Sequence, residues 1–160
     1  MEIVLKTLLL TNLIAICLQD LHERKIYVFL LGCAFLCLTL LHLNHNPAIL
    51  VLLTSSINLG ILLGMAILVG ICTKLWLRKP LRKSVGLGDV YFFIALAVGF
   101  PTGTFVVLLS ASLVFSWAVY QVVKKKLKDP LVPLAGFQAL FLFVALALNS
   151  CFHISNLYLL

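Results

Sequence analysis

The chain has 160 residues, of which 63% are hydrophobic and 11% are charged, and its mean hydropathy is +1.18. A soluble domain of this length could not bury so much apolar surface, because globular chains are about half apolar and about a quarter charged. The net charge of +7 does not indicate nucleic-acid binding, since the basic residues form short clusters between apolar runs and not a basic face with interleaved aromatic residues. The composition predicts a single membrane domain over residues 1–160.

Three apolar segments occupy the first half of the chain, and a spanning helix needs about 20 apolar residues. The third run, residues 48–77, is longer than one crossing requires, and hydroxyl residues interrupt its start. We therefore predict a surface lead-in over residues 47–56 and a spanning helix over residues 58–77. Gly60 and Gly64 form a G-x-x-x-G pair in this helix, which permits close helix contact. The first two segments are expected at about residues 3–19 and 26–43.

Three further apolar segments follow a basic stretch in the second half of the chain. The fourth segment, residues 90–100, is short and ends before Pro101, which indicates a short helix. Pro130 and Pro133 open the sixth segment, because proline is tolerated in the first turn of a helix. The fifth and sixth segments are expected at about residues 104–123 and 130–149, and a partly apolar tail at the membrane interface at residues 150–160.

The basic residues indicate how the chain is oriented in the membrane. Eleven of the twelve Lys and Arg residues lie in or beside the breaks after the first, third and fifth segments. With six spans these breaks share one side, and positive charge marks the cytoplasmic side. We therefore expect an all-α, polytopic membrane protein with about six transmembrane helices and both termini outside. The eleven residues are Arg24, Lys25, Lys74, Arg78, Lys79, Arg82, Lys83, Lys124, Lys125, Lys126 and Lys128.

Histidine and cysteine residues do not suggest a metal centre. The five cysteines lie in apolar stretches without a C-x-x-C pair, which is typical of small packing residues and predicts neither a zinc site nor a disulfide framework. His42, His45 and His153 are expected to be surface residues near the outer face.

Two of the five acidic residues occupy similar places at the cytoplasmic ends of predicted helices. Asp20 closes the first helix and Asp89 opens the fourth. A carboxylate at the bilayer centre costs about 2.5–3.5 kcal/mol and less near a boundary, so such residues often mark function. Each has a structural alternative, because Asp20 could pair with Arg24 four residues on and Asp89 could be a helix N-cap.

As a pair, the two aspartates suit aspartic proteolysis. One carboxylate acts as a base on water, and the other protonates the substrate carbonyl and later the leaving amine. Gly86 and Gly88 let the backbone turn tightly and let an extended substrate approach Asp89. The alternative class is a small proton- or ion-coupled transporter, in which the aspartates would bind ions. A transporter is expected to hold its acids near mid-membrane, whereas both acids here lie at one boundary.

The segment Gly86-Leu-Gly-Asp89 matches the G-x-G-D motif of membrane aspartic proteases. Together with Asp20, the short fourth helix and Pro130-Leu-Val-Pro133, it makes nearly the whole chain resemble the type IV prepilin peptidase and preflagellin peptidase family. The resemblance implies an aspartic endopeptidase that needs no metal or cofactor. The site residues that it implies are the catalytic Asp20 and Asp89 and the supporting Gly86, Gly88, Pro130 and Pro133.

The resemblance also implies a substrate and a location. The substrate would be the basic leader peptide of a prepilin-like protein, cleaved at the cytoplasmic face of the inner membrane of a prokaryote, with membrane lipid as the other partner. The chain departs from the family pattern at Tyr27, where the family usually has proline, and at Tyr91, where a lysine often stands. A catalytically inactive member of the same fold is therefore a further alternative. The cysteine-rich methylating portion of bifunctional members is absent, so N-methylation is not expected.

Overall fold

The computed structural model describes residues 2–23, 26–73, 75, 86–123, 134–152 and 157–158. Within these residues the chain is entirely helical, as expected for an all-α protein, and no strand occurs there. The helices are α1 (Glu2–Glu23), α2 (Val28–His45), α3 (Ala48–Cys72), α4 (Leu87–Gly99), α5 (Thr102–Val123) and α6 (Leu134–Phe152).

Four of these helices, α1, α2, α3 and α5, are long and apolar enough to cross a membrane. Helices suit this environment because they satisfy their backbone hydrogen bonds internally. α4 and the apolar part of α6 are shorter, and the 13 residues of α4 reach only about 20 Å at about 1.5 Å per residue. That all six helices cross the membrane stays a prediction. The basic clusters that predict the orientation of the chain lie outside the described residues, and so do Pro130 and Pro133.

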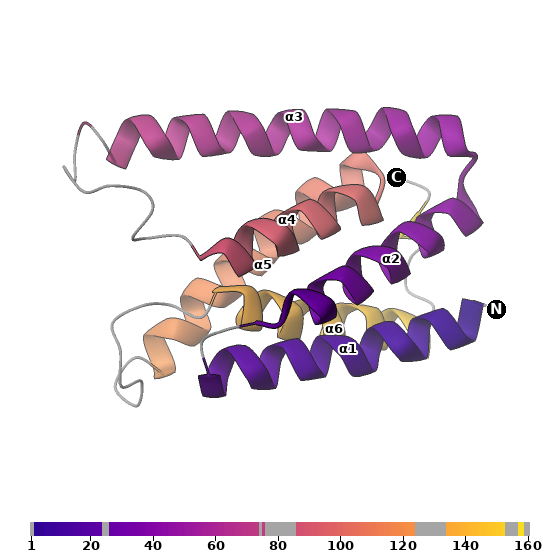
Figure 1. Cartoon of the computed structure of the whole chain (residues 1–160), viewed down its shortest axis with the longest axis horizontal. Helices are drawn as coiled ribbons and strands as arrows, with labels where there is room; N and C mark the ends of the chain where they lie inside the picture. The colour runs from indigo at the N-terminus through magenta and orange to yellow at the C-terminus, as the bar shows by residue number, and fades with distance from the viewer. Residues whose placement is uncertain are drawn as a thin grey trace.

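The helices pack around a core in which α1, α2, α4 and α6 meet (Figure 1). α6 packs mainly against α1 and α5, and α2 packs mainly against α1 and α4. On α1, Leu9, Leu13, Ile16 and Asp20 are buried at intervals of three or four residues, which places them on one face of the helix. Figure 1 shows α3 and α1 on opposite sides of the molecule.

The start of α3 differs from the prediction, because residues 48–56 continue the same helix instead of forming a surface lead-in. Two of the three hydroxyl side chains that suggested a break donate hydrogen bonds inside the helix, whereas the buried Ser55 Oγ has no hydrogen-bond partner among the described residues. Thr54 Oγ1 donates to the carbonyl of Leu50 (2.9 Å), and Ser56 Oγ donates to the carbonyl of Leu52 (2.8 Å). A Ser or Thr that donates to the backbone one turn earlier can therefore stay in an apolar helix.

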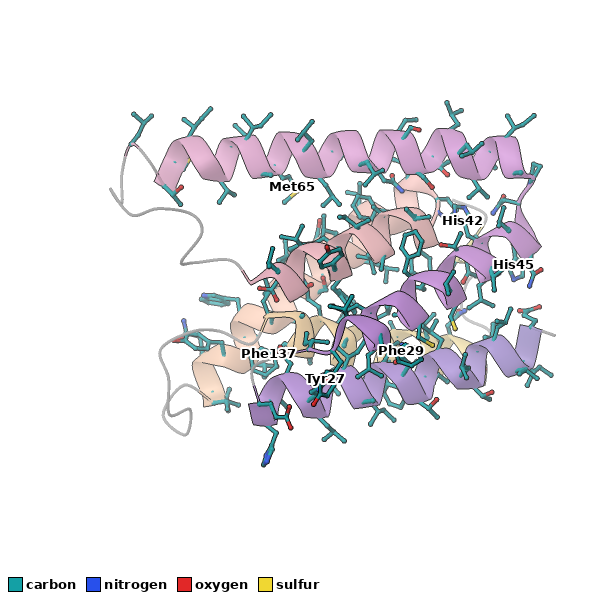
Figure 2. The ribbon with its side chains drawn as sticks, in the orientation of Figure 1. Tyr27, Phe29, His42, His45, Met65 and Phe137 are labelled. Carbon is teal, nitrogen blue, oxygen red and sulfur yellow. The ribbon has the colours of Figure 1, made fainter. Side chains whose placement is uncertain are left out.

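The second half of α3 packs little against the rest of the chain. Every residue from 63 to 69, including Met65, which Figure 2 labels, is exposed. A Cβ added at Gly60 or Gly64 would meet no atom within 4 Å. The G-x-x-x-G pair therefore makes no close helix contact within the described chain, although its sequence permits one.

Buried polar side chains from α2 and α3 hold the C-terminal end of α4. Asn58, fully buried, donates from Nδ2 to the carbonyls of Ala97 (2.8 Å) and Phe100 (2.9 Å). His42 Nδ1 lies 2.8 Å from the carbonyl oxygen of Val98, so the proton is on Nδ1. The last carbonyls of a helix lack partners within it, and these donors supply them. His42 is therefore buried near the end of α2 (Figure 2), and its prediction as a surface residue is wrong.

The C-terminal region, predicted as a partly apolar tail at the membrane interface, contacts the bundle at Leu157 and Tyr158. α6 extends to Phe152, beyond its predicted end near residue 149. Leu157 and Tyr158 return to the bundle, where Thr104 Oγ1 donates to the carbonyl of Leu157 (2.8 Å) and Asn46 Nδ2 to that of Tyr158 (3.1 Å). Tyr158 is only 7% exposed. This part of the chain thus covers the end of the bundle at which α1 begins.

Candidate active site

Asp20 lies in the last turn of α1, on the same face as the core residues Leu13 and Ile16. This helical spacing turns the carboxylate inward, and the residue is 8% exposed. Its Oδ2 accepts a hydrogen bond of 2.7 Å from the amide of Gly136 on α6. The predicted alternative partner, Arg24, lies outside the described residues.

Asp89 is the third residue of α4, and the N-cap of that helix is Gly86. Its Oδ2 accepts a hydrogen bond of 3.1 Å from the amide of Gly86, as an acidic residue does at this position of a capping box. Its Oδ1 accepts a hydrogen bond of 2.8 Å from the amide of Ala135 on α6. The half-buried side chain therefore both stabilises the start of its own helix and binds a second helix.

The first turn of α6 brings the two carboxylates together. Ala135 and Gly136 are consecutive residues, and their amides have no acceptors within their own helix because they lie in its first turn. Asp20 is close enough to Asp89 to repel its charge. The partial positive charge at the N-terminus of α6 offsets this repulsion. Both aspartates therefore bind the same turn of α6 and lie at the same end of the bundle.

Glycine at position 136 is required by the contact with Asp20. A Cβ at this position would lie 2.9 Å from Oδ2 and 3.0 Å from Cβ of Asp20, closer than carbon atoms pack. Gly136 and Ala135 are not recognisable as site residues from the sequence, because they bind the carboxylates through the backbone. The sequence feature that points to this contact is a pair of small residues at the start of the last helix, where another chain segment can come close to the backbone.

The two glycines of the G-x-G-D motif have different surroundings. A Cβ at Gly88 would lie 3.2 Å from Cδ1 of Ile26, so this glycine lets α4 approach the chain between α1 and α2. A Cβ at Gly86 would lie 3.2 Å from Oδ2 of Asp89. Gly86 is exposed, and its small size leaves the Asp89 carboxylate uncovered on that side.

The two departures from the family pattern lie on the surface. Tyr27, labelled in Figure 2 at the start of α2, is 66% exposed, and Tyr91 is 52% exposed. The backbone amide of Tyr27 donates to Oε1 of Gln19 (3.2 Å), which joins α1 to the start of α2. No group of three or more His, Cys, Asp or Glu side chains that could hold a metal ion occurs within the described residues.

The chain was compared with protein-family models, with curated proteins and with solved structures, and nothing in any of the three matches it. The resemblance to prepilin peptidases therefore depends on the motif residues and on the order of the helices.

Proposed function

We propose that the chain is a membrane aspartic endopeptidase that uses Asp20 and Asp89 to cleave basic leader peptides of type IV prepilin-like proteins at the cytoplasmic membrane face. The observation that supports this proposal most is the binding of both carboxylates to adjacent amides in the first turn of α6. Two buried or half-buried acids of like charge are costly to hold together, and an acid–base pair is a function that needs them in this arrangement.

The reaction divides between the two carboxyl groups. The ionised carboxylate takes a proton from water, whose oxygen attacks the carbonyl carbon of the scissile peptide bond. The protonated carboxyl group donates its proton to the carbonyl oxygen. When the tetrahedral intermediate breaks down, the C–N bond breaks and the leaving amine takes up the proton that the pair received from water. A hydroxyl group of the intermediate returns its proton to the pair, so a carboxylic acid product forms and the pair again holds one proton. The amides of Ala135 and Gly136 keep both groups oriented throughout.

The surface beside Asp89 fits a substrate that continues into the membrane. Leu87 is 80% exposed, and Val90 and Tyr91 are also exposed, so α4 presents an apolar surface directly next to the carboxylate. A prepilin-like substrate combines a polar basic leader with an apolar helix. We propose that the apolar helix lies along this part of α4 while the leader stays on the cytoplasmic side, in the inner membrane of a prokaryote.

The test is cleavage of such a substrate by the purified protein in lipid vesicles. Asp20→Asn and Asp89→Asn should each abolish cleavage, because asparagine keeps an oxygen for the α6 amides but cannot exchange the proton. Glu23→Gln is the matched control, since this exposed acid lies one turn from Asp20, and it should cleave like the parent chain. Retained cleavage in either aspartate variant, or a parent chain that cleaves no basic-leader substrate, would contradict the proposal.

A further inference from the structure

The exposed aromatic side chains of the described residues lie towards the end of the bundle that holds the carboxylate pair. Among the described Phe, Tyr and Trp residues, those exposed are Tyr27, Phe29, Tyr91 and Trp117. The other large apolar side chains that are exposed in the described chain are Leu, Ile, Val and Met. Tyr and Trp prefer the boundary between lipid tails and headgroups, because each combines an apolar ring with a polar hydrogen-bonding group.

The two exposed tyrosines lie at the level of the carboxylates along the bundle. The backbone amide of Tyr27 donates to the side chain of Gln19 (3.2 Å), which precedes Asp20 in the chain. Tyr91 follows Asp89 by two residues on α4, a rise of about 3 Å at about 1.5 Å per residue. Both rings are more than half exposed, so they face the surroundings of the bundle at this level.

The contact between α5 and α6 gives the level of Trp117. The two helices run antiparallel (Figure 1), and the rings of Phe115 and Phe141 have their centroids 5.5 Å apart. Gly136, whose amide binds Asp20, precedes Phe141 by five residues. The α5 residue level with Gly136 therefore follows Phe115 by five residues, which is three residues beyond Trp117. Trp117 thus lies about 4.5 Å further towards the middle of the bundle than the carboxylate of Asp20.

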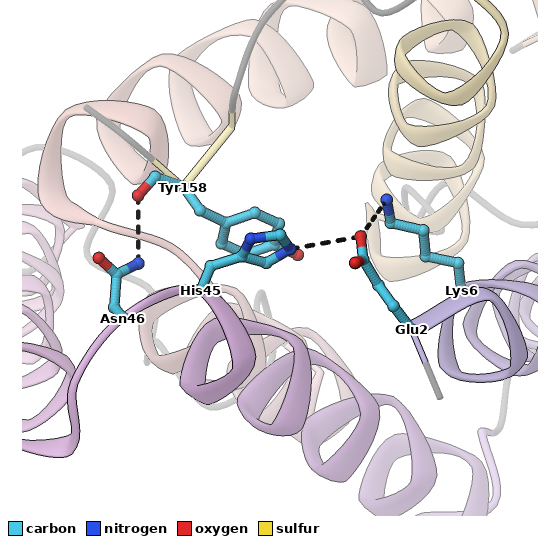
Figure 3. A network of polar contacts seen from close by, with 5 residues as sticks. All are labelled: Glu2, Lys6, His45, Asn46 and Tyr158. Atoms are coloured by element: carbon cyan, nitrogen blue, oxygen red, sulfur yellow. Dashed lines mark hydrogen bonds and ion pairs between the residues drawn. The ribbon is translucent and has the colours of Figure 1, made fainter.

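The opposite end of the bundle carries charged groups, and its tyrosine is buried (Figure 3). Glu2 Oε1 lies 2.7 Å from Lys6 Nζ and 3.3 Å from His45 Nε2, while Tyr158 stacks on His45. Charged groups avoid the hydrocarbon core, so Glu2 belongs at one boundary of the membrane. Asp20 follows Glu2 by 18 residues on α1, a rise of about 27 Å, and a hydrocarbon core is about 30 Å thick. The carboxylate end therefore lies at the other boundary.

The distribution of the three rings over the helices favours a lipid contact over a protein contact. Tyr and Trp are also enriched in protein interfaces, but there they form a patch on one face. Here Tyr27 begins α2, Tyr91 lies on α4 and Trp117 lies on α5. α2 packs mainly against α1 and α4, whereas α5 packs mainly against α6. The rings are therefore exposed on different sides of the bundle at nearly one level, and a bilayer surrounds a bundle at one level.

We propose that Tyr27, Tyr91 and Trp117 form an aromatic belt that binds the headgroup boundary of a phospholipid bilayer and holds the carboxylate pair at that depth. The interfacial layer on each side of the hydrocarbon core is about 5–7 Å thick, so rings that differ by about 4.5 Å along the bundle fit within it. At this depth Asp20 and Asp89 exchange protons with interfacial water. The belt also gives a role to Tyr27 and Tyr91, which depart from the prepilin peptidase pattern, and it does not depend on the proposed proteolysis.

Quenching of tryptophan fluorescence by brominated lipid measures the depth of each ring. The full chain is reconstituted in vesicles of phosphatidylcholine that is brominated either near the headgroup or near the end of an acyl chain. The chain has two tryptophans, so Trp76→Phe leaves Trp117 as the single reporter. Two further reporters combine Trp76→Phe and Trp117→Phe with either Tyr27→Trp or Tyr91→Trp. All three reporters should lose more fluorescence with bromine near the headgroup than with bromine near the chain end.

A deeper reporter on α5 is the matched control. Val114→Trp, combined with Trp76→Phe and Trp117→Phe, places the ring at an exposed position three residues further from the carboxylate end. Its quenching should shift towards the lipid that is brominated near the chain end. A reporter at Tyr27, Tyr91 or Trp117 that is quenched most by this deep bromine would lie in the hydrocarbon core. A reporter that neither lipid quenches would lie in water or against protein. Either result would overturn the proposal.

Discussion

Asp20 and Asp89 accept hydrogen bonds from two consecutive amides, those of Gly136 and Ala135, although they lie on different helices. The carboxylates are thus oriented by backbone groups at the start of α6, where the helix dipole favours negative charge. This relationship makes the aspartates and the first turn of α6 one structural unit. Changes in that turn should therefore act on the acids without altering either acidic residue.

Gly136→Ala should reduce cleavage by about a hundredfold, the effect expected when a reacting group is displaced by about 1 Å. The added Cβ would lie 2.9 Å from Asp20 Oδ2, so the carboxylate has to move. Gly64→Ala is the matched control, because a Cβ there meets nothing within 4 Å, and it should keep full activity. Rates measured in the same vesicles decide the question. Full activity in Gly136→Ala would show that the contact with Asp20 does not matter for the reaction.

Replacing the amide of Ala135 by an ester, through incorporation of lactic acid, should lower cleavage by at least tenfold. The ester keeps the side chain and removes only the N–H that donates to Asp89, a hydrogen bond to a charged group worth about 1.5–3 kcal/mol. The control is the same ester at Ala139, whose amide serves the helix itself. Both esters should lower the thermal stability, and only the first should lower cleavage. Equal losses of cleavage would indicate a purely structural effect.

Substitution of Gly88 should depend on the size of the new side chain. The nearest atom to a Cβ at this position is Cδ1 of Ile26, the mobile end of a side chain, at 3.2 Å. Gly88→Ala should therefore retain part of the activity, whereas the branched side chain in Gly88→Val should inactivate the protein. Gly32→Val serves as the control, since a Cβ at Gly32 meets nothing within 4 Å. An active Gly88→Val variant would contradict the close packing at this glycine.

Asn58→Leu should destabilise the fold by about 2–4 kcal/mol, because it leaves two buried carbonyls of α4 without a donor. Those carbonyls belong to Ala97 and Phe100. Ser56→Ala on the same helix removes an exposed hydroxyl that only bonds back to its own helix, and its stability should change little. Denaturant unfolding of the reconstituted protein measures both effects. Equal stability of the two variants would show that α4 does not depend on Asn58.

Much of the fold follows from hydropathy, and the exceptions have identifiable causes. All six predicted segments correspond to helices of the described chain. The start of α3 was predicted wrongly, because Thr54 and Ser56 were read as a break while their hydroxyls donate to carbonyls one turn earlier. His42 was predicted on the surface, because its partner, the carbonyl of Val98, is a backbone atom that leaves no trace in the sequence.

In the candidate site, too, some features could be predicted from the sequence and others could not. The meeting of Asp20 and Asp89 could be expected, since the chemistry of an acid pair and the G-x-G-D motif both require it. The role of Ala135 and Gly136 could not be expected, because every residue type except proline has the amide N–H that binds Asp89. The need for glycine at 136 arises only from the approach of α1. Likewise, the sequence predicts only a partly apolar tail at the membrane interface around Tyr158, and its packing against His45 beside a cavity becomes visible in the structure.

We propose that Asp20 and Asp89 act as one acid–base unit, and a double-mutant cycle measures this coupling. Cleavage rates are compared for the parent chain, Asp20→Asn, Asp89→Asn and the double variant in the same vesicles. Residues that act as a unit are strongly non-additive. We expect each single variant to fall to the same residual rate and the double variant to fall no further. A double variant whose loss is the product of two moderate single losses would contradict the claim.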